Sequence, residues 1–172
     1  MDLTPTMTAE APRSDFAHQL ERHRKIVFKV ANSYAWHPDD RDELAQDIAM
    51  QLWRAFPSYD PQRRFSTWMY RIALNVAISY VRSHSQHDHH IVAFDAALHD
   101  VADEREMDAE TDDQIRALQR VIARLDVLNR ALLLLYLDEH SYREIGDILG
   151  LSETNVATKI NRLKQRIRND LS

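Results

Sequence analysis

Residues 141–168 decide how this chain folds, and their sequence is Ser-Tyr-Arg-Glu-Ile-Gly-Asp-Ile-Leu-Gly-Leu-Ser-Glu-Thr-Asn-Val-Ala-Thr-Lys-Ile-Asn-Arg-Leu-Lys-Gln-Arg-Ile-Arg. The pattern predicts two short helices joined by a tight turn. Ser141 is a good N-cap, and Glu144 three residues later completes a capping box. Gly150 follows the first helix, where glycine lets the chain turn at little steric cost. Ser152 then begins the second helix as its N-cap.

The second predicted helix has a narrow apolar stripe and a polar, basic face. Apolar residues recur at spacings of four, three and four, at Val156, Ile160, Leu163 and Ile167. The opposite side carries Thr154, Asn155, Thr158, Lys159, Arg162 and Arg166. Five basic residues and no acidic residue lie between Lys159 and Arg168. This layout predicts a helix-turn-helix whose second helix enters the DNA major groove. The alternative is an ordinary helical hairpin with a solvated basic face.

Composition favours an all-α protein. The 172 residues include only two glycines and five prolines, against 44% hydrophobic residues. There is no cysteine, which excludes disulfides and cysteine-based metal sites. No apolar run approaches 18 residues and no signal-peptide pattern is present, so we expect a soluble, cytoplasmic protein without membrane insertion.

Charge divides the chain into parts. The formal net charge is −5, but residues 1–82 hold 11 basic and 10 acidic side chains and residues 115–172 hold 10 basic and 7 acidic. Residues 83–114 hold one basic and 10 acidic side chains. We therefore expect two helical domains joined by a flexible acidic linker. The predicted boundaries are a disordered tail (1–13), an N-terminal domain (14–82), an acidic, histidine-rich linker (83–112) and a C-terminal domain (113–172).

Two helices are predicted in the first half of the N-terminal domain. Near-helical spacing of apolar residues predicts one helix from Asp15 to Tyr34. A second helix, capped by Asp39 or Asp40, is predicted to run to about Phe56, with an apolar stripe at Leu44, Ile48, Leu52 and Phe56. Its other side carries Asp40, Asp42, Glu43, Gln46 and Asp47. This acidic face is either simply solvated or a docking surface for a basic partner.

A third helix is predicted from Phe65 to Arg82, after a loop that begins at Pro57. Its buried stripe is expected to be Phe65, Met69, Ile72, Val76 and Tyr80. A neighbouring face carries Trp68, Arg71 and Asn75, and Arg63 and Arg64 precede the helix. Aromatic, guanidinium and amide groups together suit stacking on unpaired bases and binding of phosphates. Core or rim aromatics are the alternative interpretation of Trp68 and Tyr70.

The linker contains a histidine cluster, and two helices are predicted after it. His84, His87, His89 and His90 are able to capture a transition metal in principle. A polar linker offers no rigid frame for such a site, so we expect no metal and no cofactor. Helices are predicted from Asp113 to Arg124 and from Leu125 to Leu137, and with the helix-turn-helix they form a four-helix C-terminal domain.

Two separate runs resemble one protein family. Asp40-Arg-Asp-Glu-Leu-Ala-Gln-Asp-Ile-Ala-Met-Gln-Leu-Trp53, followed by Phe65-Ser-Thr-Trp-Met-Tyr-Arg-Ile-Ala-Leu-Asn75, resembles the N-terminal domain of a bacterial RNA polymerase sigma factor. Residues 132–168 resemble the C-terminal sigma domain. The short two-domain layout is similar to that of the extracytoplasmic-function group. The resemblance covers roughly residues 15–82 and 113–170.

The resemblance implies a role for each face. Asp40, Asp42, Glu43, Gln46 and Asp47 would dock on the clamp of the largest polymerase subunit. The minus-ten element would be melted and recognised by Arg63, Arg64, Trp68, Arg71 and Asn75, with one base flipped into a pocket beside the 57–65 loop. The minus-thirty-five element would be recognised in duplex form by Thr154, Asn155, Thr158, Lys159, Arg162 and Arg166.

The resemblance also implies partners and excludes an enzyme. Promoter DNA, core polymerase, including the flap of its second subunit, and an anti-sigma or other gating protein would be the partners. Ala157, Glu153 and Asp126 depart from the basic residue, glycine and proline that the family often carries nearby. A stand-alone helix-turn-helix regulator with an N-terminal sensing domain is the alternative. A metal-dependent enzyme is a third reading, which no nucleophile–base arrangement supports.

Overall fold

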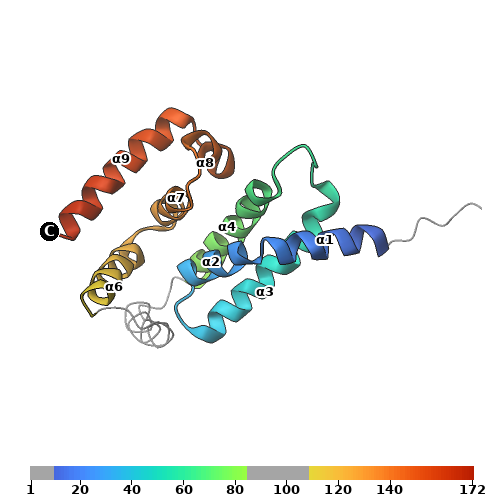
Figure 1. Cartoon of the computed structure of the whole chain (residues 1–172), viewed down its shortest axis with the longest axis horizontal. Coiled ribbons are helices and arrows are strands. Elements are labelled where there is room, and N and C mark those ends of the chain that lie inside the picture. The colour runs from blue at the N-terminus through green and yellow to red at the C-terminus, as the bar shows by residue number, and fades with distance from the viewer. Residues whose placement is uncertain (1–9, 85–108) are drawn as a thin grey trace, which may run out of the picture.

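The computed structural model describes residues 10–84 and 109–172, and all regular elements in these residues are helices (Figure 1). The N-terminal domain contains α1 (Glu10–Arg22), α2 (Arg24–Tyr34), α3 (Pro38–Ala55), the short 3-10 helix η1 (Phe56–Ser58) and α4 (Phe65–His84). The C-terminal domain contains α6 (Ala109–Arg124), α7 (Val127–Leu137), α8 (Tyr142–Leu149) and α9 (Glu153–Asp170). The prediction of an all-α chain with two helical domains is confirmed.

Helix α1 begins earlier than expected. The predicted tail reached residue 13, but the chain is helical from Glu10. The helix is anchored by Phe16, which is only 4% exposed. Its ring packs against Trp53 and Phe56 with centroids 5.2 and 5.0 Å apart. A helical turn that precedes a firmly buried aromatic ring is stabilised by that tertiary contact rather than by its own propensity.

The single helix predicted from Asp15 to Tyr34 is wrong, because His23 divides it into α1 and α2. His23 leaves the helical conformation, with ψ of 14°, and its Nδ1 lies 3.0 Å from the Gln19 carbonyl oxygen. Its ring lies against Phe65, 5.2 Å away. The break thus lets each helix pack on its own neighbours, which a continuous apolar pattern does not reveal.

Helix α3 is capped one turn position earlier than predicted. His37, not Asp39 or Asp40, is the N-cap, and its Nδ1 accepts a hydrogen bond from the Asp39 amide at 3.3 Å. Pro38 occupies the first helical position, which suits proline because the amide it lacks would have no helical partner there. Arg41 fastens the preceding turn by donating to the Trp36 carbonyl at 2.8 Å.

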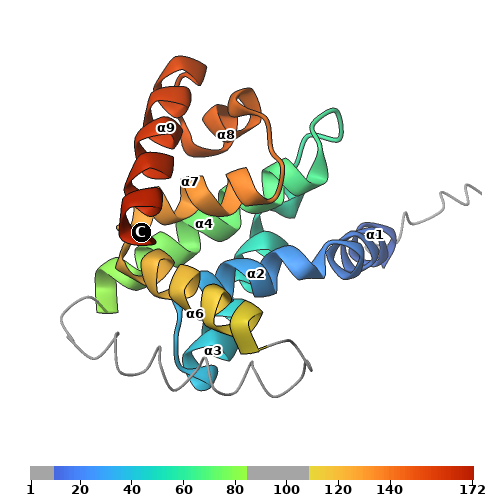
Figure 2. The same ribbon diagram turned by 60° about the vertical axis from the view of Figure 1, so that its left-hand side comes forward.

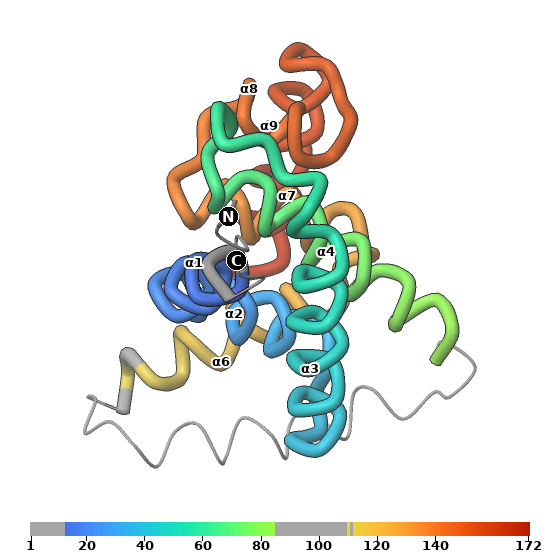
Figure 3. Tube along the Cα trace, turned by 90° about the vertical axis from the view of Figure 1, so that its right-hand side faces the viewer, coloured from blue at the N-terminus to red at the C-terminus, as the bar shows by residue number. Residues whose placement is uncertain are grey.

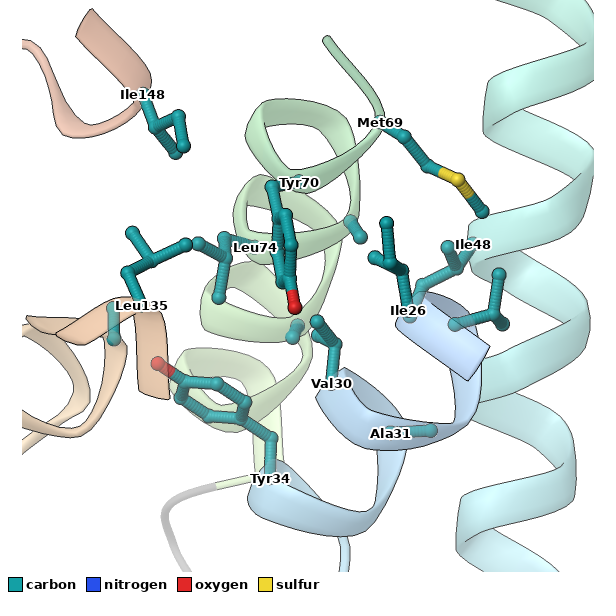
Figure 4. Close-up of a cluster of buried hydrophobic side chains, with 14 of the residues drawn as sticks. Ile26, Val30, Ala31, Tyr34, Ile48, Met69, Tyr70, Leu74, Leu135 and Ile148 are labelled. Carbon is teal, nitrogen blue, oxygen red and sulfur yellow. The ribbon is translucent and has the colours of Figure 1, made fainter. Parts of the chain in front are cut away.

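Helix α4 buries two sides rather than the single stripe predicted. Phe65 and Met69 are buried as expected, but Ile72, Val76 and Tyr80 are only half-buried. The remaining buried positions are Tyr70, Ala73, Leu74 and Ala77. Figure 4 shows why: Met69 points toward Ile48 of α3, whereas Leu74 lies beside Leu135 of α7. The second buried side faces the C-terminal domain.

Both ends of the predicted 83–112 linker are helical, because α4 continues to His84 and α6 begins at Ala109. Acidic residues in the first turn of α6, Glu110 and Asp112, interact favourably with the positive end of the helix dipole. Asp112 also pairs with Arg116 one turn later at 2.8 Å. The favourable dipole and this ion pair together support helix within a stretch whose acidity suggested only a linker.

Helix α7 begins at a well-formed cap. Asp126, at a position where the family often carries proline, accepts a hydrogen bond from the Asn129 amide at 2.8 Å. An aspartate cap satisfies a helix amide that would otherwise lack a partner, so this departure preserves the start of the helix.

The helix-turn-helix forms as predicted, with one exception. Ser141 and Ser152 cap their helices by accepting from the amides of Glu144 and Asn155, each at 3.1 Å. Gly150 ends α8 in the left-handed conformation, with φ of 71°. The capping box is wrong in one half, because the Glu144 carboxylate lies against His140 Nδ1 at 2.9 Å instead of returning to the cap.

The two domains pack directly on each other. Helices α7 and α8 contact α4, and α7 also contacts α2, so that buried side chains of both domains form one continuous cluster (Figure 2). Figure 3 shows α3 and α4 side by side in the N-terminal domain, with α8 and α9 beyond the far end. In the described ranges, no helix is long and apolar enough to cross a membrane.

Gly146 is required by close packing within the helix-turn-helix. A Cβ at this position would lie 2.5 Å from the Leu151 carbonyl oxygen, closer than real contacts allow. We expect Gly146→Ala to lower the free energy of unfolding by about 1–3 kcal/mol, the usual cost of overpacking. Chemical denaturation monitored by circular dichroism measures the change. As a control, Gly150→Ala meets no atom within 4 Å and is penalised only by its φ of 71°. A Gly146→Ala chain as stable as the parent would contradict this account.

Candidate nucleic-acid interface

One face of α9 is open to solvent and carries the residues predicted to contact duplex DNA. Lys159 is half-buried, and the exposed members of the set are Thr154, Asn155, Thr158, Arg162 and Arg166. The opposite side is held by Val156, Ile160 and Leu163, which are all buried. The structure therefore brings this predicted set together on one accessible helix face.

Lys164 is basic but lies off that face. Its ammonium group sits 4.4 Å above the ring of Tyr136 in α7. A hydrogen bond to Tyr136 is the largest cause of a raised pKa for Lys164. Of the five basic residues in the run from Lys159 to Arg168, this one stabilises the packing of α9 on α7.

The residues predicted to contact unpaired DNA lie at the start and middle of α4. Arg63, Arg64, Arg71 and Asn75 are exposed, and Trp68 is half-buried. The exposed face is continuous with the loop that precedes the helix. This loop is held by Tyr59, whose hydroxyl donates to the Arg63 carbonyl at 2.6 Å.

An aromatic cluster supports this loop. The Trp68 ring lies 5.0 Å from Tyr59, 5.2 Å from Phe65 and 6.3 Å from Phe56. Burial is the largest cause that raises the pKa of Tyr59, followed by the charges of Asp60 and Asp15, so its hydroxyl stays protonated. Trp68 is thus partly a packing residue and partly an exposed π surface, so both interpretations of this side chain hold in part.

The acidic face of α3 is divided between two grooves. Glu43 and Asp47 line a groove of about 650 Å³ between α3 and α4, together with Asn75, Tyr80 and others. The pKa of Tyr80 is raised by its burial and by the charges of three carboxylates, Asp40, Glu43 and Asp47. The same groove therefore joins residues from the predicted polymerase set and the predicted minus-ten set.

Asp42 and Gln46 line a second groove, of about 400 Å³, between α2 and α3. Its floor includes apolar side chains such as Val27 and Ala49. Phe28 also borders this groove and is 51% exposed. The five predicted polymerase-binding residues therefore do not share one groove.

Sequence reasoning missed the exposed apolar residues on these two helices. Phe28 is 51% exposed, Met50 is 52% exposed and Trp53 is 42% exposed. The available signal was their position: Met50 and Trp53 lie outside the four-residue stripe that begins at Leu44. Large apolar side chains left uncovered beside an acidic rim indicate a protein-binding surface.

One predicted DNA-binding residue contacts the other domain. Arg64 Nη1 lies 3.5 Å from Oε1 of Glu144, in α8. Among the residues that the structure describes, no group of three or more His, Cys, Asp or Glu side chains is arranged to hold a metal ion. Of the four linker histidines, His84 stacks on Tyr80 at 4.1 Å, and His87, His89 and His90 lie outside the described residues.

Comparison with known proteins identifies two family regions. The family model described as Sigma-70 region 2 matches residues 20–87, and the one described as Sigma-70, region 4 matches residues 115–167. Together they span 121 of the 172 residues, 68 in the first match and 53 in the second.

Curated relatives match along most of the chain. The ECF RNA polymerase sigma factor SigW of Bacillus subtilis is 25% identical over 91% of this chain and 88% of its own length. The RNA polymerase sigma factor NccH of Alcaligenes xylosoxydans is 26% identical over 92% of this chain and 88% of its own.

Two solved structures share the fold. The sigma factor RpoE of Bartonella quintana, in complex with the anti-sigma factor NepR, has a TM-score of 0.68 at 17% identity, covering 91% of this chain and 96% of that one. CnrH, in complex with the cytosolic domain of CnrY, has a TM-score of 0.65 at 22% identity, covering 91% and 87%. With region 2 followed by region 4 and sigma-factor relatives along nine-tenths of its length, this chain belongs to the extracytoplasmic-function group of bacterial RNA polymerase sigma factors.

Proposed function

We propose that this protein binds core RNA polymerase and directs promoter recognition, promoter melting and transcription initiation, with no catalysis of its own. One observation carries the proposal: a single chain exposes both a basic recognition helix, α9, and an aromatic and amide-bearing face on α4. Intact duplex is recognised by a helix in the major groove, whereas separated strands need side chains that replace lost base stacking.

The minus-thirty-five element is assigned to α9. Asn155 and Thr158 project from the N-terminal half of the helix, the part that contacts base edges in helix-turn-helix proteins. Arg162 and Arg166 follow on the same side and suit phosphate contacts or bidentate contacts to guanine. Ala157, half-buried beside this face, supplies no basic group there.

The minus-ten element is assigned to α4 and the loop before it. Trp68 offers a ring for stacking, Arg71 and Asn75 offer hydrogen bonds to bases, and Arg63 and Arg64 offer charge to the backbone. We place the flipped base beside the 57–65 loop. A base leaves its stack at a cost of a few kcal/mol, which aromatic stacking and hydrogen bonds in a pocket offset.

Polymerase docking is assigned to α3 and the neighbouring part of α2. The acidic residues Asp40, Asp42, Glu43 and Asp47, with Gln46, surround or adjoin the exposed apolar residues found there. An apolar centre with a charged rim is the usual composition of a protein interface. The complementary partner is a surface with basic and apolar residues, which we assign to the polymerase clamp, while the C-terminal domain meets the flap.

We propose that a gating protein controls access to these surfaces in the cytoplasm, where polymerase acts. The two structural neighbours were each solved in complex with another protein, RpoE with the anti-sigma factor NepR and CnrH with part of CnrY. The alternative, a stand-alone regulator with a sensing domain, is not favoured, because residues 20–87 match a sigma region rather than a ligand-binding domain.

Transcription in vitro tests the whole proposal. Purified protein added to core polymerase and a promoter library is expected to yield transcripts from a defined subset of promoters. The protein without polymerase is expected to protect no promoter from nuclease, because few phosphate contacts leave binding weak at physiological salt. Equal promoter selection with and without polymerase would instead support the stand-alone regulator.

Substitutions on α3 and α4 are expected to separate docking from melting. Asn75→Ala should reduce promoter opening, measured by permanganate reactivity of unpaired thymines, by about tenfold, as expected from losing one hydrogen bond of about 1.4 kcal/mol. It should leave core binding unchanged. The paired changes Asp42→Lys and Asp47→Lys should instead weaken core binding, measured by competition with a labelled chain. If each variant changed both measurements equally, the assignment would be wrong.

Two positions on α9 are expected to differ in kind. Asn155→Ala should relax base preference in the minus-thirty-five element, at about 1–3 kcal/mol of discrimination. Arg166→Ala should weaken holoenzyme binding to all promoters alike and reduce the slope of log affinity against log salt by about 1. Lys164→Gln, a change of a basic residue off this face, is the matched control and should leave base preference unchanged. A salt slope unaltered by Arg166→Ala would remove that residue from the DNA interface.

A further inference from the structure

The contact between the two domains is held by specific polar bonds at one end. Tyr70 of α4 donates from its hydroxyl to Asp138 Oδ2 at 2.6 Å, and Lys29 of α2 pairs with Asp138 Oδ1. Burial disfavours the charged form of Asp138, but the hydrogen bonds from Lys29 and Tyr70 outweigh it and lower the pKa of the carboxyl. Asp138 is therefore an ionised acceptor shared by two residues of the other domain.

A second set of contacts lies at the far end of α2. The Tyr34 hydroxyl donates to the Val127 carbonyl at 2.8 Å. Arg130 of α7 lies over the rings of both Tyr34 and Trp36, each at 5.1 Å, and donates to the Ser33 carbonyl at 3.3 Å. Arg130 is only 7% exposed. A guanidinium buried between aromatic rings is well placed only while the domains stay together.

Apolar packing fills the space between these two sets. Tyr34, Tyr70, Leu74 and Leu135 are each 2% exposed or less (Figure 4). Figure 4 shows Leu74 beside Leu135, with Tyr70 above and Tyr34 below them. Separating the domains would expose these side chains to water, so the packed arrangement is a stable state of the chain rather than a loose encounter.

The packed arrangement also occupies a DNA-binding residue. The Glu144 carboxylate of the helix-turn-helix lies 3.5 Å from the Arg64 guanidinium, which is assigned to the minus-ten strand. A carboxylate presents to arginine much the same charge and oxygen geometry as a phosphate. The exposed pair adds little stability, but DNA must displace Glu144 before it binds Arg64.

Promoter geometry is incompatible with packed domains. The names of the two promoter elements place them 25 base pairs apart, which is about 85 Å of duplex at 3.4 Å per base pair. A compact chain of 172 residues is only about 40 Å across. Residues 85–108, which lie outside the described part, number 24 and have a contour length of up to about 80 Å. Both elements can be bound at once only if the domains separate.

We propose that the packing of α7 and α8 on α2 and α4 is an autoinhibitory contact, and that core RNA polymerase is the partner that opens it by holding the two domains apart. This inference rests on the proposed function. It assigns a role to Tyr34, Tyr70, Arg130 and Asp138, none of which belongs to the DNA-binding or polymerase-binding sets. The closed chain keeps its two DNA-binding surfaces from acting on a promoter until polymerase is bound.

The double variant Tyr34→Phe with Tyr70→Phe tests the contact, because it removes two interdomain hydrogen bonds and keeps both rings. The population of separated domains is expected to rise about tenfold or more, since each bond is worth severalfold in an equilibrium constant. Single-molecule energy transfer between dyes on Arg54→Cys and Asn169→Cys measures it, because the chain has no other cysteine. Half-maximal transcription should also require less core polymerase. Tyr136→Phe, whose partner Lys164 lies in the same domain, is the matched control and should change neither measurement.

A cleavable cross-link provides the opposite test. Lys29→Cys with Asp138→Cys, joined by a bismaleimide reagent containing a disulfide, should hold the domains closed and abolish transcription, and reduction of the reagent should restore it. A cross-linked chain that transcribes as well as the cleaved one would overturn the inference. So would unchanged energy transfer and unchanged polymerase requirement in the tyrosine variant, while the parent chain still directs transcription. If the parent chain itself fails to direct transcription with core polymerase, the proposed function fails, and the inference falls with it.

Discussion

Helix α4 must bury two of its sides and expose a third, and the rest of the structure depends on this division. Residues four apart in a helix share a side, so three neighbouring rows run along α4. One row, with Met69, faces α3, and the next, with Tyr70 and Leu74, faces the C-terminal domain. The third row, with Arg71 and Asn75, stays exposed. A single helix thereby joins the N-terminal core, the domain contact and the proposed strand-binding face.

The domain contact differs from an ordinary core in its buried hydroxyl groups. Burial is the main cause of the raised pKa of Tyr34 and Tyr70, so both remain neutral donors under all ordinary conditions. A buried hydroxyl without a partner is costly, and the partners of these two lie in the other domain. The polar bonds therefore select one relative placement of the domains, while apolar burial supplies most of the stabilisation.

The charge distribution fits a protein that acts on DNA only as part of a larger assembly. Basic residues gather on α9, whereas α3 presents carboxylates on two grooves and the net charge is −5. Such a chain attracts DNA weakly as a whole and strongly only at one helix. The exposed apolar residues Phe28, Met50 and Trp53 beside the carboxylates provide the surface through which the missing contacts would be gained.

Local chemistry let the sequence by itself determine the all-α class, the helix-turn-helix with its caps at Ser141 and Ser152 and its turn at Gly150, and the exposed basic face of α9. These features depend on neighbours within a few residues, and caps, glycine turns and helical spacing act at that range. Only the tertiary structure decided the break at His23, the second buried row of α4 and the contact between the domains. Those depend on which surfaces meet across a separation of some 100 residues, as Lys29 and Asp138 do, and no periodicity along the chain records that choice.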